Sequence, residues 1–177
     1  GGNPEQWKGN LRYKYECAFE RKHSLSDRQK RPFQSFRTTN FIVKRAVFVQ
    51  YPFDEKLTHY GYEDVLWGKT LEENGVQIIH INNPITLTDY ENNTLFIDKT
   101  EESLRTLYEY QMLLKGYSKL LEARDRVVLS HLLKVVLIIN KLFGKKVKKL
   151  LQGNKPSIFL FNVYKLMYYI SLEQQTR

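Results

Sequence analysis

The sequence contains a single cysteine, Cys17, among its 177 residues. One thiol cannot form a disulfide within the chain, and it cannot supply the several cysteine ligands of a zinc or iron–sulfur site. We therefore expect a reducing, cytoplasmic setting. The chain is long enough to bury a hydrophobic core, and with 42% hydrophobic and 14% aromatic residues it is too apolar for a disordered tail.

Long apolar runs are also missing. The longest, over residues 127–143, is interrupted by polar residues such as Lys134 and Asn140, and it is shorter than the roughly 20 apolar residues that cross a bilayer as a helix. Residues 1–4 have neither the basic start nor the apolar run of a secretory signal. We expect no transmembrane span. Because the chain starts at Gly1 without methionine, we expect it to be a processed or cut product.

Acidic residues are too few to balance the basic ones, and the net charge is +9. Eleven Lys or Arg face three acids between Lys8 and Arg45, and six lysines face no acid between Lys141 and Lys155. Such density attracts phosphate groups, whether of nucleic acid, anionic lipid or a nucleotide-sugar. The alternative is a solvated face that only keeps the protein soluble.

The first part of the chain predicts an α/β fold. In chain order we expect a helix over residues 11–22, a loop over 23–32, a strand over 36–43, a helical turn over 45–50, a helix over 62–73 and a strand over 76–81. The two strand predictions come from runs of β-branched and aromatic residues. Asn74-Gly75 is the expected stop of the preceding helix, with glycine in the left-handed position. Strand, helix and strand in this order indicate an α/β layer.

The second part predicts a small helical bundle. Asp98 with Glu101 is typical of a capping box, so we expect a helix to begin there and to run to about Arg124. Residues 127–143 are apolar on nearly every side and predict a buried central helix. Residues 144–156 then form a basic connector, and residues 157–172 a last, aromatic helix.

The sequence from Tyr60 to Asp64, Tyr-Gly-Tyr-Glu-Asp, is the most informative stretch. Acids in the first turn of a helix are ordinary stabilisers, so adjacent Glu63 and Asp64 indicate little alone. Here two tyrosine rings that can stack on a sugar flank Gly61, which lets the backbone turn sharply and approach a ligand. Trp67, one turn later, lines the same pocket or anchors the helix in the core, and we favour the anchor.

Six short motifs of the sequence occur in the order found in bacterial family 2 glycosyltransferases. They are Gly1-Gly2, residues 11–16 (LRYKYE), 36–41 (FRTTNF), 53–55 (FDE), 60–64 (YGYED) and 80–84 (HINNP), and residues 99–104 (KTEESL) extend the match. Over about residues 1–107 the chain resembles the acceptor-side, C-terminal half of a GT-A fold enzyme. We therefore divide it into an acceptor-side portion, residues 1–97, and a C-terminal helical extension, residues 98–177.

The resemblance implies transfer of a sugar from a nucleotide-sugar to an acceptor hydroxyl, with inversion at the anomeric carbon. It makes Asp64 the general base that deprotonates the acceptor, while Glu63 holds the acceptor or orients its neighbour. Together with the aromatic loop, the residues expected at the sugars are Tyr60, Gly61, Tyr62, Asn40, Thr39 and His59. Arg37 or Arg12 is expected to face the diphosphate.

The sequence departs from the family pattern at the metal site. GT-A enzymes hold a divalent ion, Mn²⁺ or Mg²⁺, with an Asp-x-Asp motif, and this sequence has none; Leu87 stands about where similar sequences place a histidine. We expect the ligands to lie mostly outside this chain, no metal site within it, and a structural role for His80. The donor-binding half is then missing, the chain alone is inactive, and open strand edges invite dimerisation.

Two alternatives belong to other functional classes. The basic, aromatic composition fits a nucleic-acid-binding module, although no zinc finger, RNP-like word or helix-turn-helix supports it. A scaffold with a membrane-facing surface would use the lysines of residues 145–149 beside Leu150 and Leu151. Peripheral contact with the inner membrane is compatible with the transferase hypothesis.

Overall fold

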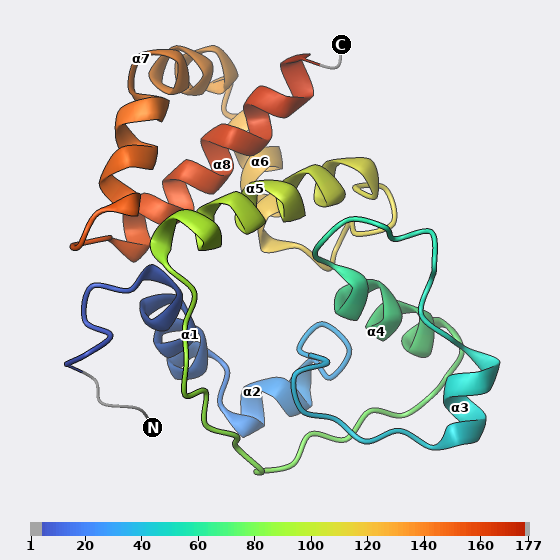
Figure 1. Ribbon diagram of the computed structural model, residues 1–177. Helices are drawn as coiled ribbons and strands as arrows, with labels where there is room; N and C mark the ends of the chain where they lie inside the picture. Colours follow the sequence, from blue (N-terminus) through green and yellow to red (C-terminus); the bar gives the residue numbers. More distant parts are fainter. Residues whose placement is uncertain (1–4, 176–177) are drawn as a thin grey trace.

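The computed structural model describes residues 5–175, and all their regular structure is helical (Figure 1). In chain order the helices are α1 (Leu11–Lys22), α2 (Leu25–Lys30), α3 (Arg45–Gln50), α4 (Glu63–Glu73), α5 (Asn93–Glu109), α6 (Lys119–Leu129), α7 (Leu133–Gln152) and α8 (Ile158–Gln175). Helix accounts for 59% of the described residues, and no residue between 5 and 175 is in a strand.

The prediction of an α/β fold built as half of a GT-A domain is therefore wrong. The apolar runs at residues 36–43 and 76–81 follow turns and irregular backbone. A β-branched run becomes a strand only where a neighbouring strand satisfies its backbone N–H and C=O groups, and the described residues offer none. Ile42, Ile79 and Ile81 consequently remain exposed. Dimerisation through open strand edges loses its basis with the sheet.

Helices α5 and α8 form the centre of the helical part. Helix α8 packs against α7, α5, α6 and α1, and the bundle lies above the α2–α4 segments in the view of Figure 1. One core cluster joins α1, α5, α7 and α8 through Leu11, Phe96, Ile97, Leu151, Phe161 and Tyr164. A second surrounds Tyr169 with Leu104, Leu107, Leu114 and Leu121, and both stabilise the bundle by removing apolar area from water.

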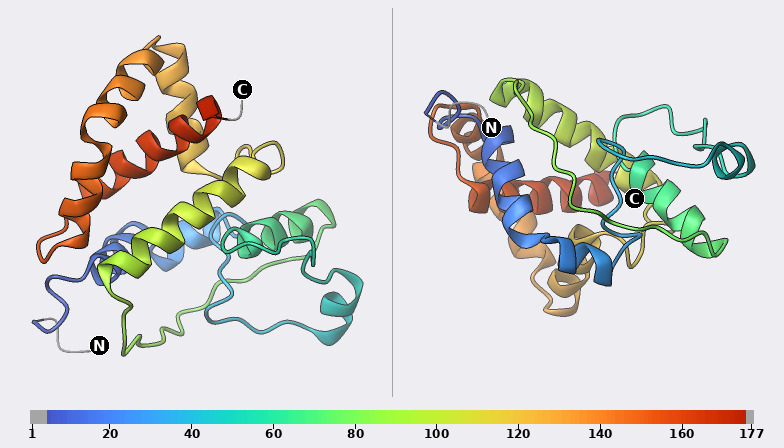
Figure 2. Two further views of the ribbon diagram at one scale, coloured as in Figure 1. Left: turned by 45° about the horizontal axis from the view of Figure 1, so that its top comes forward. Right: turned by 90° about the horizontal axis from the view of Figure 1, so that it is seen from below.

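Helix α4 is anchored by a separate aromatic cluster. Trp67 is 3% exposed and packs with Phe36 and Leu71. Its indole Nε1 donates a hydrogen bond to the Tyr51 carbonyl oxygen at 2.7 Å, which satisfies the polar atom of a buried tryptophan. The expectation that Trp67 anchors the helix in the core is confirmed. An irregular segment then leads from α4 along the lower edge of the molecule, in the view of Figure 1, to the start of α5 (Figures 1 and 2).

Local signals located several helices correctly. Helix α1 has the predicted bounds, α3 occupies the predicted helical turn, and α4 ends where Gly75 takes φ 67°. The loop predicted over residues 23–32 contains α2 instead. Ser24 caps that helix, because its side chain accepts from the Asp27 N–H while Asp27 accepts from the Ser24 N–H.

The C-terminal predictions need more correction. Helix α5 begins at Asn93, with Asn92 as its N-cap, so Asp98 and Glu101 lie within the helix and do not form a capping box. Both carboxylates instead form ion pairs with Lys148. The expected central helix over residues 127–143 is divided by a turn in which His131 has φ 58°, and much of it is exposed. The expected basic connector is mostly the second half of α7, whereas the last aromatic helix, α8, is confirmed.

Among the described residues no single helix is long and apolar enough to cross a membrane. Helices α6 and α7 meet that test only as a pair, and they are bent by 113° relative to each other.

Candidate functional site

Two left-handed residues precede the paired acids at the start of α4. Gly61 has φ 99° and Tyr62 has φ 68°, and the chain then enters the helix directly at Glu63 and Asp64. A Cβ atom at Gly61 would lie 2.4 Å from the Cβ atom of Ser103 on α5. Glycine is therefore required twice, for its backbone angle and for this close approach.

Helix α5 holds the residue before that turn by both of its backbone groups. The Tyr60 N–H donates to the Glu102 carboxylate at 3.1 Å, and the Thr106 hydroxyl donates to the Tyr60 carbonyl oxygen at 3.0 Å. The Tyr60 ring stays half exposed, with the Lys99 ammonium 5.7 Å from its centre. Helix α5 thus fixes the backbone of Tyr60 while the ring remains accessible.

The second tyrosine has a different role. The Tyr62 ring packs against the cluster around Leu104, Leu107 and Tyr169, and burial raises the pKa of its hydroxyl well above the ordinary value. A ring enclosed by the core is not available to stack on a ligand. Of the two aromatic residues predicted at the acceptor, the structure leaves Tyr60 accessible and uses Tyr62 to attach α4 to the bundle.

The adjacent carboxylates occupy different environments. Asp64 is half-buried, and its Oδ1 accepts a hydrogen bond from the Val65 N–H at 2.8 Å. Desolvation, followed by the neighbouring Glu63 carboxylate, raises the pKa of Asp64, while Arg37 acts in the opposite direction. Glu63 is exposed and lines a hollow of about 140 Å³ together with Lys69. A carboxylate with a raised pKa is suited to accept a proton near neutral pH.

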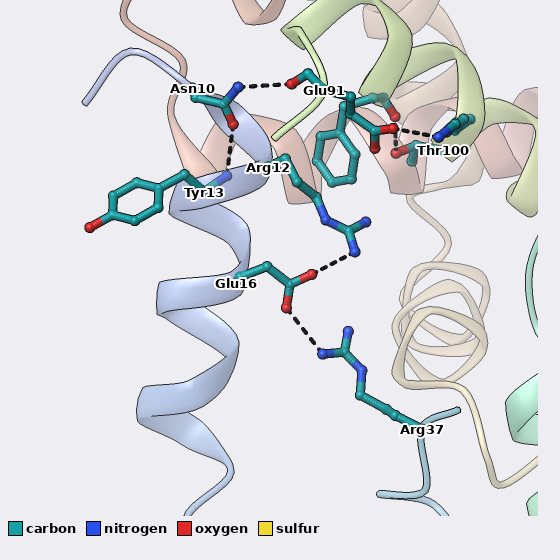
Figure 3. Close-up of polar contacts among 9 residues, drawn as sticks. Asn10, Arg12, Tyr13, Glu16, Arg37, Glu91 and Thr100 are labelled. Atoms are coloured by element: carbon teal, nitrogen blue, oxygen red, sulfur yellow. Dashed lines mark hydrogen bonds and ion pairs between the residues drawn. The ribbon is translucent and has the colours of Figure 1, made fainter. Parts of the chain in front are cut away.

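The two arginines predicted at the diphosphate both bind one buried acid (Figure 3). Arg12 Nη2 lies 2.8 Å from Glu16 Oε1, and Arg37 Nη1 lies 3.0 Å from Glu16 Oε2. Each guanidinium also covers a phenylalanine ring, Phe96 under Arg12 at 5.1 Å and Phe19 under Arg37 at 4.1 Å. Glu16 thus joins α1 to the loop that carries Arg37, and it was not predicted as a site residue.

The remaining residues predicted to contact the sugars are Asn40, Thr39 and His59. Asn40 Nδ2 donates to the Asn83 carbonyl oxygen at 2.8 Å. This hydrogen bond connects two of the motifs that carry the family resemblance, residues 36–41 and 80–84. Thr39 and His59 are exposed. No hydrogen bond or ion pair between residues 5 and 175 joins Asn40, Thr39 or His59 to Asp64.

No group of three or more His, Cys, Asp or Glu side chains in the described part of the chain is placed to hold a metal ion. His80 hydrogen-bonds through Nε2 to the Pro32 carbonyl oxygen at 2.9 Å, so it connects the irregular segment after α4 to the loop before Phe36. That contact supports the predicted structural role of His80, although the residue is not in a strand.

A larger hollow than the one at Glu63 is lined by neither of the paired acids. It has a volume of about 690 Å³ and lies where the starts of α1 and α5 meet the end of α7, with Trp7, Asn10, Asn92 and Asn154 among its lining residues. The contacts to Tyr60 lie further along α5, at Glu102 and Thr106. The catalytic prediction therefore rests on the loop at α4 and not on a deep pocket.

No protein family, no curated protein and no solved structure matches this chain in comparisons with known proteins.

Proposed function

We propose that this chain carries the general base and a sugar-contacting loop of an inverting glycosyltransferase that moves a sugar from a nucleotide-sugar to a glycan hydroxyl. One observation carries the proposal beside the sequence resemblance: the environment of Asp64. Its half-buried carboxylate lies in the first turn of α4, two residues after Tyr62, and desolvation and Glu63 together raise its pKa. Desolvation and a like charge are the usual means by which proteins adjust a catalytic carboxylate.

The chemistry follows from that carboxylate. As the acceptor oxygen attacks the anomeric carbon, Asp64 takes the hydroxyl proton, and the bond to the nucleoside diphosphate breaks with its electron pair on the leaving phosphate oxygen. Attack from the face opposite the leaving group inverts the anomeric centre. Glu63, exposed beside the base, is positioned to hold an acceptor hydroxyl, and the Tyr60 ring supplies an accessible stacking face.

The donor side is part of the same proposal. A divalent cation, Mn²⁺ or Mg²⁺, neutralises charge on the departing diphosphate when it is bound. We propose that most of its ligands, and the nucleotide-binding residues, come from outside this chain. The chain alone is then inactive.

The test is a transfer assay on the complete product of the gene, with a panel of nucleotide-sugars and glycan acceptors and release of nucleoside diphosphate as the readout. Asp64→Asn should reduce turnover by about 100-fold or more, the usual scale for loss of a general base. The matched control is Glu109→Gln, which neutralises an exposed acid at the end of α5, and it should leave turnover unchanged.

Two results would reject the proposal. One is transfer by Asp64→Asn at the rate of the control. The other is the absence of transfer with every donor from a complete, folded gene product supplied with Mn²⁺ and Mg²⁺.

A further inference from the structure

Helix α7 has an exposed apolar side that the rest of the molecule leaves uncovered. The helix meets the core through Leu151, which is fully buried, and through Val147. At about 100° per residue, the exposed apolar residues of α7 fall in a sector of about 140° on a different side. With the preceding turn and the end of α6 they are Val128, Leu129, Leu132, Val135, Ile138, Ile139, Leu142, Phe143 and Leu150, which we call the α7 outer face.

These side chains are accessible to a partner. Leu129 is 78% exposed, Leu142 67% and Ile138 59%. Single exposed apolar residues are common on protein surfaces, but so many of them gathered on one side of a helix and the turn before it indicate an interaction site. The structure also corrects the sequence-based membrane hypothesis, which paired Leu150 with Leu151: only Leu150 is on the surface.

The charge beside the α7 outer face has one sign. No Asp or Glu occurs between Arg126 and Leu172. Within the described residues one lysine of α7, Lys148, is held by acids, with Asp98 at 3.1 Å and Glu101 at 2.7 Å. The remaining lysines of the helix are exposed and in no ion pair there: Lys134, Lys141, Lys145, Lys146 and Lys149.

We propose that the α7 outer face binds the surface of a lipid bilayer that contains anionic lipids. On the same 100° spacing, Lys134, Lys141 and Lys145 border the apolar sector on one side, whereas Lys146 and Lys149 fall within it near the end of α7. A helix with an apolar side and adjoining lysines lies in the plane of the headgroups, with its apolar side chains among the acyl chains and its lysines on lipid phosphates. This inference does not depend on the transferase proposal. If both hold, the Asp64 site works on acceptors beside a membrane.

The other occupants of such a face fit less well. A second copy of the chain would bring the same lysines together across the interface, and like charges oppose that pairing. Nucleic acid would satisfy the lysines but would leave the apolar row in contact with water. An anionic bilayer satisfies both features.

Co-sedimentation with vesicles tests the proposal. Binding of the protein to phosphatidylcholine vesicles is compared with binding to vesicles that also contain phosphatidylglycerol, at low and high salt. We expect binding to the anionic vesicles alone, weakened by salt. The triple variant Lys145→Gln, Lys146→Gln, Lys149→Gln should lose about 100-fold in affinity, since each lysine near an anionic surface contributes about fivefold.

Each variant has a matched control. Lys30→Gln with Lys44→Gln and Lys56→Gln removes the same charge from exposed sites on the α2–α4 side, and it should keep most of the binding. Leu142→Ser with Phe143→Ser should abolish binding, whereas Met112→Ser with Ile42→Ser, at exposed apolar sites elsewhere, should not. Far-UV circular dichroism checks that every variant is folded.

Three outcomes would overturn the proposal. Equal binding to neutral and anionic vesicles would show that the lysines do not bind lipid phosphates. Equal losses of vesicle affinity in the two lysine triple variants would show that binding does not depend on the α7 outer face. A stable dimer, or a complex with duplex DNA, that depends on Leu142 and Phe143 without any vesicle binding would assign the face to a different partner. Because no donor or acceptor is added, none of these results depends on sugar transfer.

Discussion

Replacing Glu16 with glutamine tests whether its ion pairs with Arg12 and Arg37 hold the fold together. Glutamine keeps the shape of the side chain and one hydrogen-bond acceptor, but it removes the charge that faces two guanidinium groups at 2.8 and 3.0 Å. Glu16 itself is 7% exposed. The two arginines would then lack their common anion while still packed over Phe96 and Phe19.

The expected loss follows from this partial burial. Removing one partner of a fully buried ion pair destabilises a protein by about 3–5 kcal/mol, whereas exposed pairs contribute at most about 1 kcal/mol. The side chains of Arg12 and Arg37 are 27% and 35% exposed, so water replaces part of what the carboxylate supplies. We expect a loss of about 1–2 kcal/mol, or about 2–8 °C in Tm for a chain of this size.

Thermal unfolding followed by circular dichroism at neutral pH measures the effect. The matched control is Glu20→Gln, an exposed acid one turn later on α1, which should leave Tm nearly unchanged. Equal Tm values for the two variants would refute the structural role of Glu16. The arginines would then be available for the predicted diphosphate, and a nucleoside diphosphate should raise the Tm of the wild-type protein by mass action.

Three further substitutions test other parts of the structure. Because the native pKa of Asp64 is raised, stability is lost as pH rises through it; Asp64→Asn should therefore raise Tm at neutral pH, with a gap that closes toward about pH 4. Burial lowers the pKa of Lys165 to about 8, so below that pH the folded protein holds a desolvated ammonium group that costs stability; Lys165→Met should raise Tm by a few degrees at neutral pH and by less in alkaline buffer. Gly61→Ala should cost about 2–4 kcal/mol in urea unfolding, from its left-handed φ and the contact with Ser103. Gly75→Ala, with φ 67° but open space around it, should cost only about 1 kcal/mol, and equal losses would contradict the proposed close approach.

Helices governed by local signals were predictable from the sequence. Helix α1 is capped by Asn10, whose side chain accepts from the Tyr13 N–H at 2.8 Å, and α4 ends at a left-handed glycine. The strands were wrong because sheet formation depends on a partner far away in the chain, and residues 36–43 find none among the described residues. A row of apolar residues likewise predicts burial, but in α7 part of that row has no element to cover it.

The candidate site was predictable to a similar degree. Gly61 and Asp64 are neighbours in sequence, so their turn and helix start follow from local chemistry. The ion pair between Glu16 and Arg37 joins residues 21 positions apart in the sequence. The hydrogen bonds from Glu102 and Thr106 of α5 to Tyr60 join residues more than 40 positions apart. Such contacts depend on how helices pack, which the periodicity of a sequence does not specify. Of the two ion pairs that Glu16 makes, the one with Arg12 had a local signal in the sequence, the i, i+4 spacing of the two residues.

The pH dependence of sugar transfer by the complete gene product tests the role of Asp64 most directly. If Asp64 is the base, kcat/KM should fall on the acidic side with a single ionisation above about 3.9, the ordinary aspartate pKa. Arg37 lowers the pKa of Asp64, so Arg37→Gln should move that acidic limb to higher pH. Two results would show that another group takes the proton. One is an acidic limb at the same pH in Arg37→Gln as in the wild-type protein, and the other is an Asp64→Asn variant that keeps the wild-type rate and the same acidic limb.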